Sequence, residues 1–359
     1  MIELLFITLA LAGLPFVGKL LFPHNISWAE VALNLVAVTV LVSVAYQTSK
    51  YAQARDVEVW NGQVLSKAKV KVSCSHSYSC PPCTESCSGS GSSRSCIKTC
   101  STCYDHPYDF DWVLSTSIGK KHINRVDRQG VTEPPRFTVA QIGDPVAQTH
   151  SYTNLIKAAP ESLLNTVAEK SIREKFPHAN LPYPTKVYDY HYIDRVLTAG
   201  FELFEKGQWN RHLAESLREL GPTNEVNLVL VMTADKDPQF AHALRSFWLG
   251  GKKNDVVVVL GVDQFPTISW VQVFSWSKEE VFKVQLRDAL LELKTASPEA
   301  VFATTSGHIA QSFKRRDLKD FDYLKGEIDA PLWLTLTLLA VGSMLSMGLS
   351  MVFARNEVL

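Results

Sequence analysis

The segment LWLTLTLLAVGSMLSMGLSMVFA, residues 332–354, contains 23 residues and no charged side chain. A helix of about 20 apolar residues crosses a hydrocarbon core of roughly 30 Å, so this segment predicts a transmembrane helix. Gly342, Ser346 and Ser350 recur every four residues and therefore share one helix face. Small residues allow close helix packing, so we expect this face to pack on the N-terminal helical hairpin or on another copy of the chain, unless the spacing arises by chance.

Two further apolar runs lie near the N-terminus. Residues 4–22 carry one charge, Lys19, and residues 29–46 carry one ionisable side chain. A cleaved signal peptide begins with lysine or arginine, and neither precedes the first run, so we expect an uncleaved hairpin of two membrane helices. Asn34, within the second run, is expected to point at the small-residue face of residues 332–354.

Three spans predict an integral protein of the cell (inner) membrane, with other membrane proteins or a second copy of the chain as partners of its helices. Lys19 and Arg355 lie near the side away from the large central region, which places that region outside by the positive-inside rule. Seven cations flank the central region itself and favour the opposite orientation: Lys50, Arg55, Lys314, Arg315, Arg316, Lys319 and Lys325. The sequence leaves the side of the domain open.

The composition excludes one broad class of function. The chain has 359 residues, with 36 Lys and Arg against 36 Asp and Glu, so its formal net charge is zero. A nucleic-acid-binding protein would show a basic excess, so we expect no nucleic-acid partner. The fold class expected is α+β with transmembrane helices. Its predicted parts are two membrane helices (1–50), a cysteine-rich β module (51–150), a connecting region (151–208), an α/β domain (209–330), and a membrane helix with a short tail (331–359).

All seven cysteines lie within residues 74–103, and their spacing is nearly a mirror: C-x2-C-x3-C, eight residues, C-x3-C-x2-C. Two C-x2-C pairs separated by sixteen residues are typical of a four-cysteine zinc site. Adding one histidine gives eight ligands, enough for two tetrahedral zinc ions. These candidate ligands are Cys74, Cys80, Cys83, Cys87, Cys96, Cys100, Cys103 and His106.

Two other interpretations of the cysteines stay open. Clustered cysteines in an exported, loop-rich segment form disulfides, although an odd total leaves one thiol over. The Cys80-Pro81-Pro82-Cys83 motif could also be a redox-active pair. Zinc or disulfides would both staple a segment too polar to build its own core. The nearby Asp105, Asp109 and Asp111 are interpreted as the exposed face of a strand rather than as a metal site.

The distal region alternates between helical and β patterns. Continuous β-branched runs predict buried strands at residues 226–232, 255–262 and 269–274, and amphipathic helices separate them. This pattern favours an α/β sandwich whose sheet is covered on both faces.

Several residues occur in a characteristic order between the first two predicted strands of this region: Ala241, Phe247-Trp248, Gly250 and the turn Lys252-Lys253-Asn254-Asp255. With these residues, the chain from about 209 to 316 resembles the TPM domain family, named for thylakoid-lumen and photosystem-repair proteins. It departs from that family at Val256, where the family has glycine, and at Ser275-Trp276-Ser277, which replaces a glycine-rich stretch. The cysteine-rich region also resembles uncharacterised bacteriophage membrane proteins.

The TPM resemblance implies maintenance of membrane complexes, receptor modulation, divalent-cation binding or weak phosphatase activity. Asp235, Asp237 and Asp263 follow two predicted strands, where α/β sheets bind ligands, and are candidate ligands for calcium or magnesium. A metal-dependent phosphatase-like hydrolase at these residues is one hypothesis. The competing interpretation is helix capping, since Asp237-Pro238 is a good helix start.

No nucleotide-binding glycine loop, H-E-x-x-H motif or G-x-S-x-G motif occurs in the sequence. The first hypothesis is therefore a non-enzymatic, membrane-anchored scaffold or accessory protein that binds or maintains another membrane protein.

Overall fold

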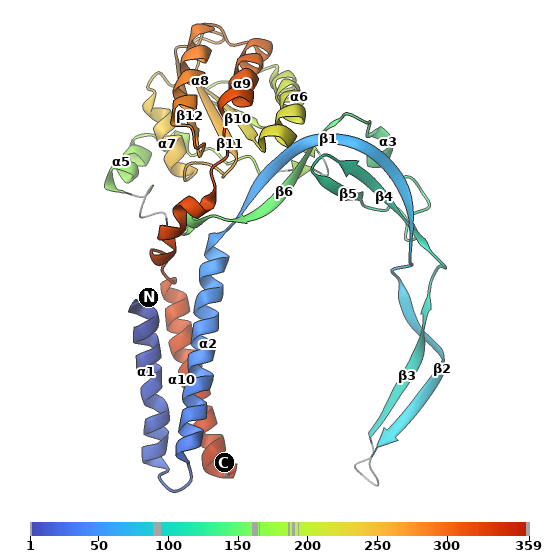
Figure 1. Cartoon of the computed structure of the whole chain (residues 1–359), viewed down its shortest axis with the longest axis vertical. Coiled ribbons are helices and arrows are strands. Elements are labelled where there is room, and N and C mark those ends of the chain that lie inside the picture. The colour runs from blue at the N-terminus through green and yellow to red at the C-terminus, as the bar shows by residue number, and fades with distance from the viewer. Residues whose placement is uncertain are drawn as a thin grey trace.

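A computed structural model describes residues 2–88, 95–159, 164, 166–185, 187–188, 191–192 and 194–356. The chain is a mixed α+β protein, and Figure 1 shows three parts. A bundle of three long helices carries a mixed α/β head at one end. A curved β arm leaves the junction between bundle and head.

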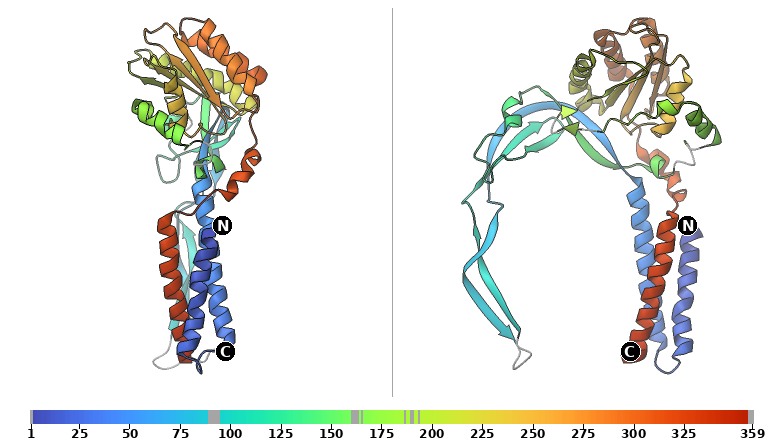
Figure 2. Two further views of the ribbon diagram at one scale, coloured as in Figure 1. Left: turned by 90° about the vertical axis from the view of Figure 1, so that its left-hand side faces the viewer. Right: turned by 180° about the vertical axis from the view of Figure 1, so that it is seen from behind.

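The bundle consists of α1 (Ile2–Leu21), α2 (Trp28–Ala54) and α10 (Leu332–Asn356), which pack side by side (Figures 1 and 2). The Ser27 side chain accepts a hydrogen bond from the Glu30 backbone N–H, and the Ser27 backbone N–H donates to the Glu30 carboxylate. This capping box fixes where α2 begins. Of the helices that the structure describes, two are long and apolar enough to cross a membrane, Trp28–Ala54 and Leu332–Arg355; the apolar helix Phe6–Leu21 is shorter.

The small-residue face of α10 packs against the two N-terminal helices. Asn34 Nδ2 donates hydrogen bonds to the Ser346 carbonyl (2.9 Å) and to the Ser350 hydroxyl (3.1 Å). A Cβ added to Gly342 would lie 2.5 Å from a methyl group of Leu11 in α1. The predicted contact between this face and the N-terminal hairpin is therefore confirmed.

The arm begins where α2 ends. Strand β1 (Arg55–Val72) pairs antiparallel with β6 (Pro145–Thr153) along its first half and with β4 (Asp109–Thr116) along its second half. With β5 (Gly119–Ile123), they form a sheet of order β5-β4-β1-β6. Its small core lies under the short helix α3 (Pro135–Val139) and is formed by Val64, Trp112, Leu114, Ile123, Phe137, Ala140 and Val146.

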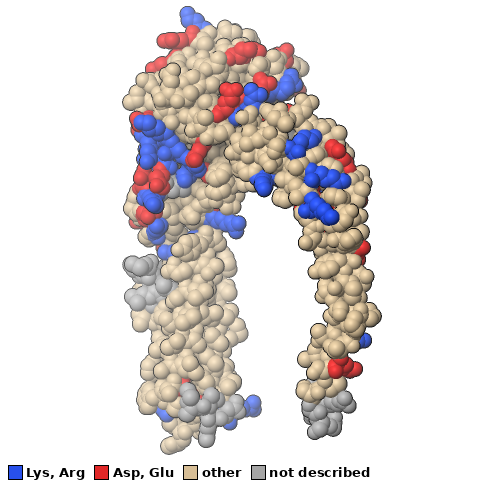
Figure 3. Space-filling view, turned by 45° about the vertical axis from the view of Figure 1, so that its right-hand side comes forward, with Lys and Arg blue, Asp and Glu red and all other residues tan. Residues whose placement is uncertain are grey.

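Strands β2 (Ser77–Ser88) and β3 (Ser95–Tyr104) form a separate antiparallel hairpin at the far end of the arm. The arm sheet curves away from the head, and the hairpin then points in the direction of the far end of the bundle (Figures 1 and 2). Open space separates the hairpin from the bundle (Figure 3). The molecule therefore has the shape of an arch whose two legs are the bundle and the hairpin.

The head contains a four-stranded sheet of order β12-β11-β10-β9, in which β9 to β11 are parallel and β12 is antiparallel. Alternate residues of β10 and β11 point to two apolar clusters on opposite faces, one packed against α6, α8 and α9 and the other against α7. The bounds of these elements are β9 (Val196–Ala199), β10 (Asn227–Thr233), β11 (Asp255–Gly261), β12 (Trp270–Ser275), α6 (Lys206–Asn224), α7 (Gln239–Phe247), α8 (Glu280–Glu292) and α9 (Pro298–Ser312). Shorter elements connect the parts: α4 (Leu155–Ala158), α5 (Val167–Lys175), η3 (Pro177–Ala179), β7 (Val187–Tyr188), β8 (His191–Tyr192) and η4 (Leu318–Gly326).

Buried polar contacts fix the start of β1 to the head. Asn254 Nδ2 donates to the Val59 carbonyl (2.7 Å), and Asn61 Nδ2 donates to the Val226 carbonyl (3.0 Å). Asn61 and Asn254 are almost completely buried, so these bonds satisfy groups that water does not reach. The base of the arm and the head therefore form one continuous packed unit.

Candidate functional site

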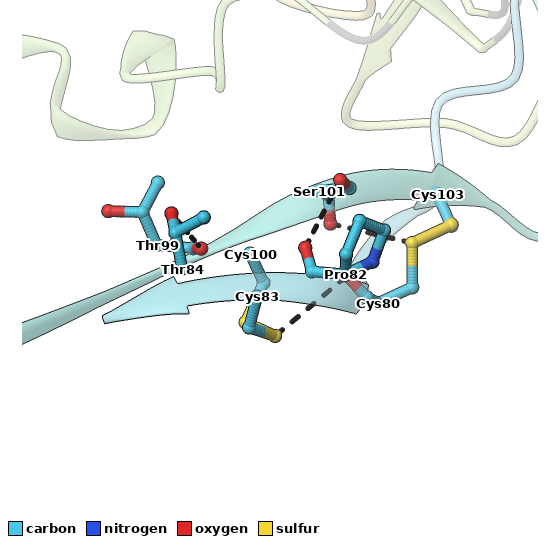
Figure 4. The surroundings of a disulfide bond; sticks show 8 residues. All are labelled: Cys80, Pro82, Cys83, Thr84, Thr99, Cys100, Ser101 and Cys103. Atoms are coloured by element: carbon cyan, nitrogen blue, oxygen red, sulfur yellow. Dashed lines mark hydrogen bonds between the residues drawn. A yellow bond between two sulfur atoms is a disulfide. The ribbon is translucent and has the colours of Figure 1, made fainter. Parts of the chain in front are cut away.

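Six of the seven cysteines form three nested disulfides across the hairpin: Cys80–Cys103, Cys83–Cys100 and Cys87–Cys96. Figure 4 shows two of them, with the Thr84 hydroxyl donating to the Thr99 carbonyl beside them. Of the interpretations that the sequence left open for the cysteines, the structure therefore has the disulfides. A disulfide sulfur offers no thiolate, so this geometry gives no support to two zinc ions held by these six residues.

The mirror spacing of the cysteines explains their pairing. Cys83 lies opposite Cys100, and Cys87 lies opposite Cys96, in the antiparallel register of β2 and β3. The register shifts between Cys80 and Cys83, so that Cys80 lies opposite Ser101, yet its disulfide still reaches Cys103. The two thiols of the Cys80-Pro81-Pro82-Cys83 motif are therefore bonded to different partners rather than to each other.

The hairpin has hardly any core of its own. Apart from Cys80, the β2 residues are exposed, and Tyr78, Ile97 and Tyr104 show more than half of their surface to solvent. An isolated two-stranded hairpin is marginally stable in water. Three disulfides therefore supply the stability that apolar burial does not provide.

The remaining thiol, Cys74, lies where the hairpin joins the arm sheet. It is buried and free, and its Sγ lies 3.9 Å from Nδ1 of His106. Ligand atoms of Cys74, His76 and Asp109 all lie within 4.8 Å of one another. The sequence analysis names Cys74 and His106 as candidate ligands, and the structure adds His76 to this group.

Asp109, the first residue of β4, is completely buried, so its interpretation as part of an exposed strand face is wrong. The Ser75 backbone N–H donates to Oδ2 at 3.0 Å, and Arg125 approaches the same oxygen at 2.7 Å. These donors hold the pKa of the Asp109 carboxyl well below its usual range, the Ser75 N–H most strongly, although burial opposes the shift.

The acidic residues at the strand ends of the head interact with protein groups. Asp235 Oδ2 lies 2.8 Å from His178 Nε2, Asp237 Oδ2 lies 3.2 Å from Lys175 Nζ, and the Ser269 hydroxyl donates to Asp263. Within the described residues, these three carboxylates belong to no group whose ligand atoms all lie within 4.8 Å. The calcium or magnesium site stays a prediction that this geometry does not support.

Capping accounts for the position of Asp237. Its Oδ1 accepts the Gln239 N–H at the start of α7 (2.9 Å), and its own N–H donates to Asp235 Oδ1 (2.8 Å). The Gln239 N–H, followed by the Lys175 ammonium, lowers the pKa of the Asp237 carboxyl. This is the helix-capping alternative of the sequence analysis.

A pocket of about 560 Å³ runs along the edge strand β12 of the head. Arg245 borders it from α7, and Lys283 and Arg287 border it from α8. Glu280 pairs with Lys283 and lies 3.3 Å from Arg316. The remaining lining residues are uncharged, so cations outnumber the single acidic residue, and such a pocket can accommodate an anionic group.

The chain matches no protein-family model, no curated protein sequence and no solved structure. The resemblance to the TPM family therefore stays a prediction, and the function has to be argued from the geometry.

Proposed function

We propose that this protein is a membrane-anchored, non-enzymatic scaffold that binds or maintains another membrane protein through its disulfide-stapled arm. The observation that carries the proposal is the hairpin, in which three nested disulfides stiffen a projecting element with almost no core. A stiff, protruding hairpin offers contact surface with little loss of conformational entropy on binding.

The disulfides support an orientation for the chain. Disulfides persist in oxidising compartments, so the arm and the head that carries it would lie on the exported side of the membrane. The turn between α1 and α2 and the end of α10 would then lie on the reducing side. Lys19 and Arg355 lie at that end of the bundle, as the positive-inside rule requires. The redox argument thereby favours one of the two orientations that charge alone leaves open.

The exposed surface of the hairpin supports a protein partner. Its strands present Ser and Thr side chains, and among the described residues each strand has one edge that pairs with no other strand. Such an edge is a template for pairing with another chain. Another protein would therefore bind along the hairpin, and Tyr78, Ile97 and Tyr104 are the large apolar side chains available for the contact.

Two measurements in intact cells test this proposal. A membrane-impermeant thiol reagent should label cysteines 80, 83, 87, 96, 100 and 103 only after reduction, and without permeabilisation. Labelling without reduction, or only in permeabilised cells, would contradict the exported orientation.

The scaffold role is tested by site-specific photo-crosslinking. A photoreactive residue at Ile97 should give a crosslink to one membrane protein, and the variant Tyr78→Ala should weaken that crosslink. The matched control is Val167, which is fully exposed on the head. Equal crosslinking from both positions, or none from Ile97, would contradict the proposal.

A further inference from the structure

We propose that Cys74, His76, His106 and Asp109 form a zinc site at the joint between the hairpin and the arm sheet. This ligand set differs from the eight ligands that the sequence suggests. It uses the one thiol that is not in a disulfide.

The four side chains come from both chain segments that cross the joint. Residues 73–76 connect β1 to β2 and contribute Cys74 and His76. Residues 105–108 connect β3 to β4 and contribute His106, and Asp109 opens β4. Strand pairing stops at Val72–Asp109 on one side of the joint and resumes at Ser77–Tyr104 on the other. A bound ion would tie the two connections together where the backbone ladder is interrupted.

Three of the four side chains lie close enough together to share one small cation, and His106 lies beside two of them. The ligand atoms of Cys74, His76 and Asp109 lie within 4.8 Å of one another. His106 Nδ1 lies 3.9 Å from the Cys74 Sγ and 3.4 Å from Asp109 Oδ1. Ligands at about 2.0 to 2.3 Å from zinc in a tetrahedron are separated from each other by distances of this order.

An unsatisfied oxygen independently indicates a ligand. Asp109 is completely buried, and within the described part of the chain its Oδ1 accepts no hydrogen bond. Its other oxygen, Oδ2, is held by the Ser75 N–H and by Arg125. A buried carboxylate oxygen that accepts no hydrogen bond is costly, and its neighbour at 3.4 Å is another proposed ligand, His106, so a shared metal ion would satisfy it. The bonds to Oδ2 are the outer-shell contacts that orient a carboxylate ligand.

The donor types select the metal. One thiolate, two imidazoles and one carboxylate give a mixed sulfur, nitrogen and oxygen set of four, which is typical of zinc. Calcium and magnesium take six or more oxygen ligands, which this cluster does not offer. Coordination would also keep the Cys74 thiol from oxidation in the compartment in which the disulfides form.

Metal binding to the purified full-length chain tests the inference. The protein is prepared in detergent without reducing agent, treated with a chelator, incubated with zinc chloride, desalted and assayed for metal. Wild type should retain one zinc ion per chain, and Cys74→Ser and His106→Ala should retain none. The matched control is His122→Ala, an exposed histidine of the same arm, which should bind as wild type does. The outer-shell variant Arg125→Met should weaken zinc affinity by about 10- to 100-fold.

A second readout does not depend on stoichiometry. Zinc should slow alkylation of Cys74 in the native protein, and chelator should restore the rate. Cobalt in place of zinc should give a thiolate-to-metal absorption band that Cys74→Ser lacks. Disulfide mapping of each variant shows whether the hairpin is intact. Wild type that binds no zinc, Cys74→Ser that binds as much as wild type, or an alkylation rate independent of zinc would each overturn the inference.

Discussion

Asn34 of α2 donates a hydrogen bond of 3.1 Å to the hydroxyl of Ser350 in α10, across 316 positions of the sequence. Both side chains are buried between the helices, and the Ser350 hydroxyl in turn donates to the Ser346 carbonyl. This contact joins the first and last parts of the chain at the base of the arch. Small side chains on α10 make it possible, since bulkier ones would hold the helices apart.

The close approach of α10 to α1 predicts the effect of enlarging Gly342. A Cβ there would lie 2.5 Å from Leu11, whereas a Cβ at Gly348 would meet no atom within 4 Å. Gly342→Leu should therefore lower the free energy of unfolding by about 1 to 3 kcal/mol, the usual cost of overpacking. Gly348→Leu is the matched control and should leave it unchanged. Thermal unfolding in detergent measures both, and equal effects would contradict the packing described.

Loss of a disulfide is expected to destabilise the hairpin and to leave the head unaffected. Each closes a loop, and losing one should cost the hairpin about 2 to 4 kcal/mol. Replacing the pair Cys87 and Cys96 by serine should make residues 77–104 sensitive to limited proteolysis while the head stays intact. The control Ser86→Ala changes an exposed residue of the same strand. Cleavage that begins in the head would show that the arm does not depend on its disulfides.

Local sequence pattern was sufficient to predict the central strands of the head. The runs 226–232 and 255–262 appear as β10 (Asn227–Thr233) and β11 (Asp255–Gly261), because continuous β-branched residues favour strands buried on both faces. The small-residue face of α10 was also predicted correctly. In both cases the determinant is the periodicity of residues close together in the sequence.

The cysteines show where sequence reasoning reached its limit. Pairs of cysteines two residues apart satisfy the spacing of a zinc site and, equally, that of a laddered hairpin. The mirror symmetry was the informative signal, because an antiparallel hairpin places mirror-related residues opposite each other and a zinc site has no such requirement. Asp109 was misjudged because a local pattern does not show its partner Arg125, which lies 16 positions away in the sequence.

A buried ion pair at the base of the arm is expected to contribute strongly to the free energy of unfolding. Glu58 of β1 is completely buried, and Arg315 from the head pairs with it and with the exposed Glu225. Arg315→Met would take the guanidinium away from the buried Glu58 carboxylate and leave the Trp60 indole N–H (2.9 Å) and His150 Nδ1 (3.3 Å) beside it. Removing one partner of a buried pair costs about 3 to 5 kcal/mol, so the variant should unfold at much lower temperature.

The compensating change distinguishes charge from packing. Glu58→Gln in the Arg315→Met background removes the uncompensated charge and should recover a large part of the lost stability. Comparison of the unfolding free energies of the two single variants and the double variant gives the coupling energy. Additive losses in the double variant would show that Arg315 acts through its packing alone.

The ionisation of Asp127 is expected to make the stability of a turn in the arm depend on pH. Its carboxylate accepts the backbone N–H groups of Gly130 (2.6 Å), Val131 (3.0 Å) and Thr132 (2.7 Å). These bonds, that from Thr132 most strongly, lower the pKa of Asp127 from 3.8 to about 2. Because the folded state binds this proton less readily than the unfolded state, the ionised carboxylate stabilises the turn above pH 3.8, and the stabilisation is lost as the pH falls through about 2.

Asp127→Asn should therefore weaken the turn at neutral pH, because the neutral amide cannot replace all three charge-assisted bonds. Amide hydrogen exchange of residues 130–132 measures the effect as the ratio of protection in wild type to that in the variant. This ratio should be constant at neutral pH and should shrink as the pH falls below 3.8. A ratio that stays the same down to about pH 2 would show that ionisation of Asp127 does not stabilise the turn.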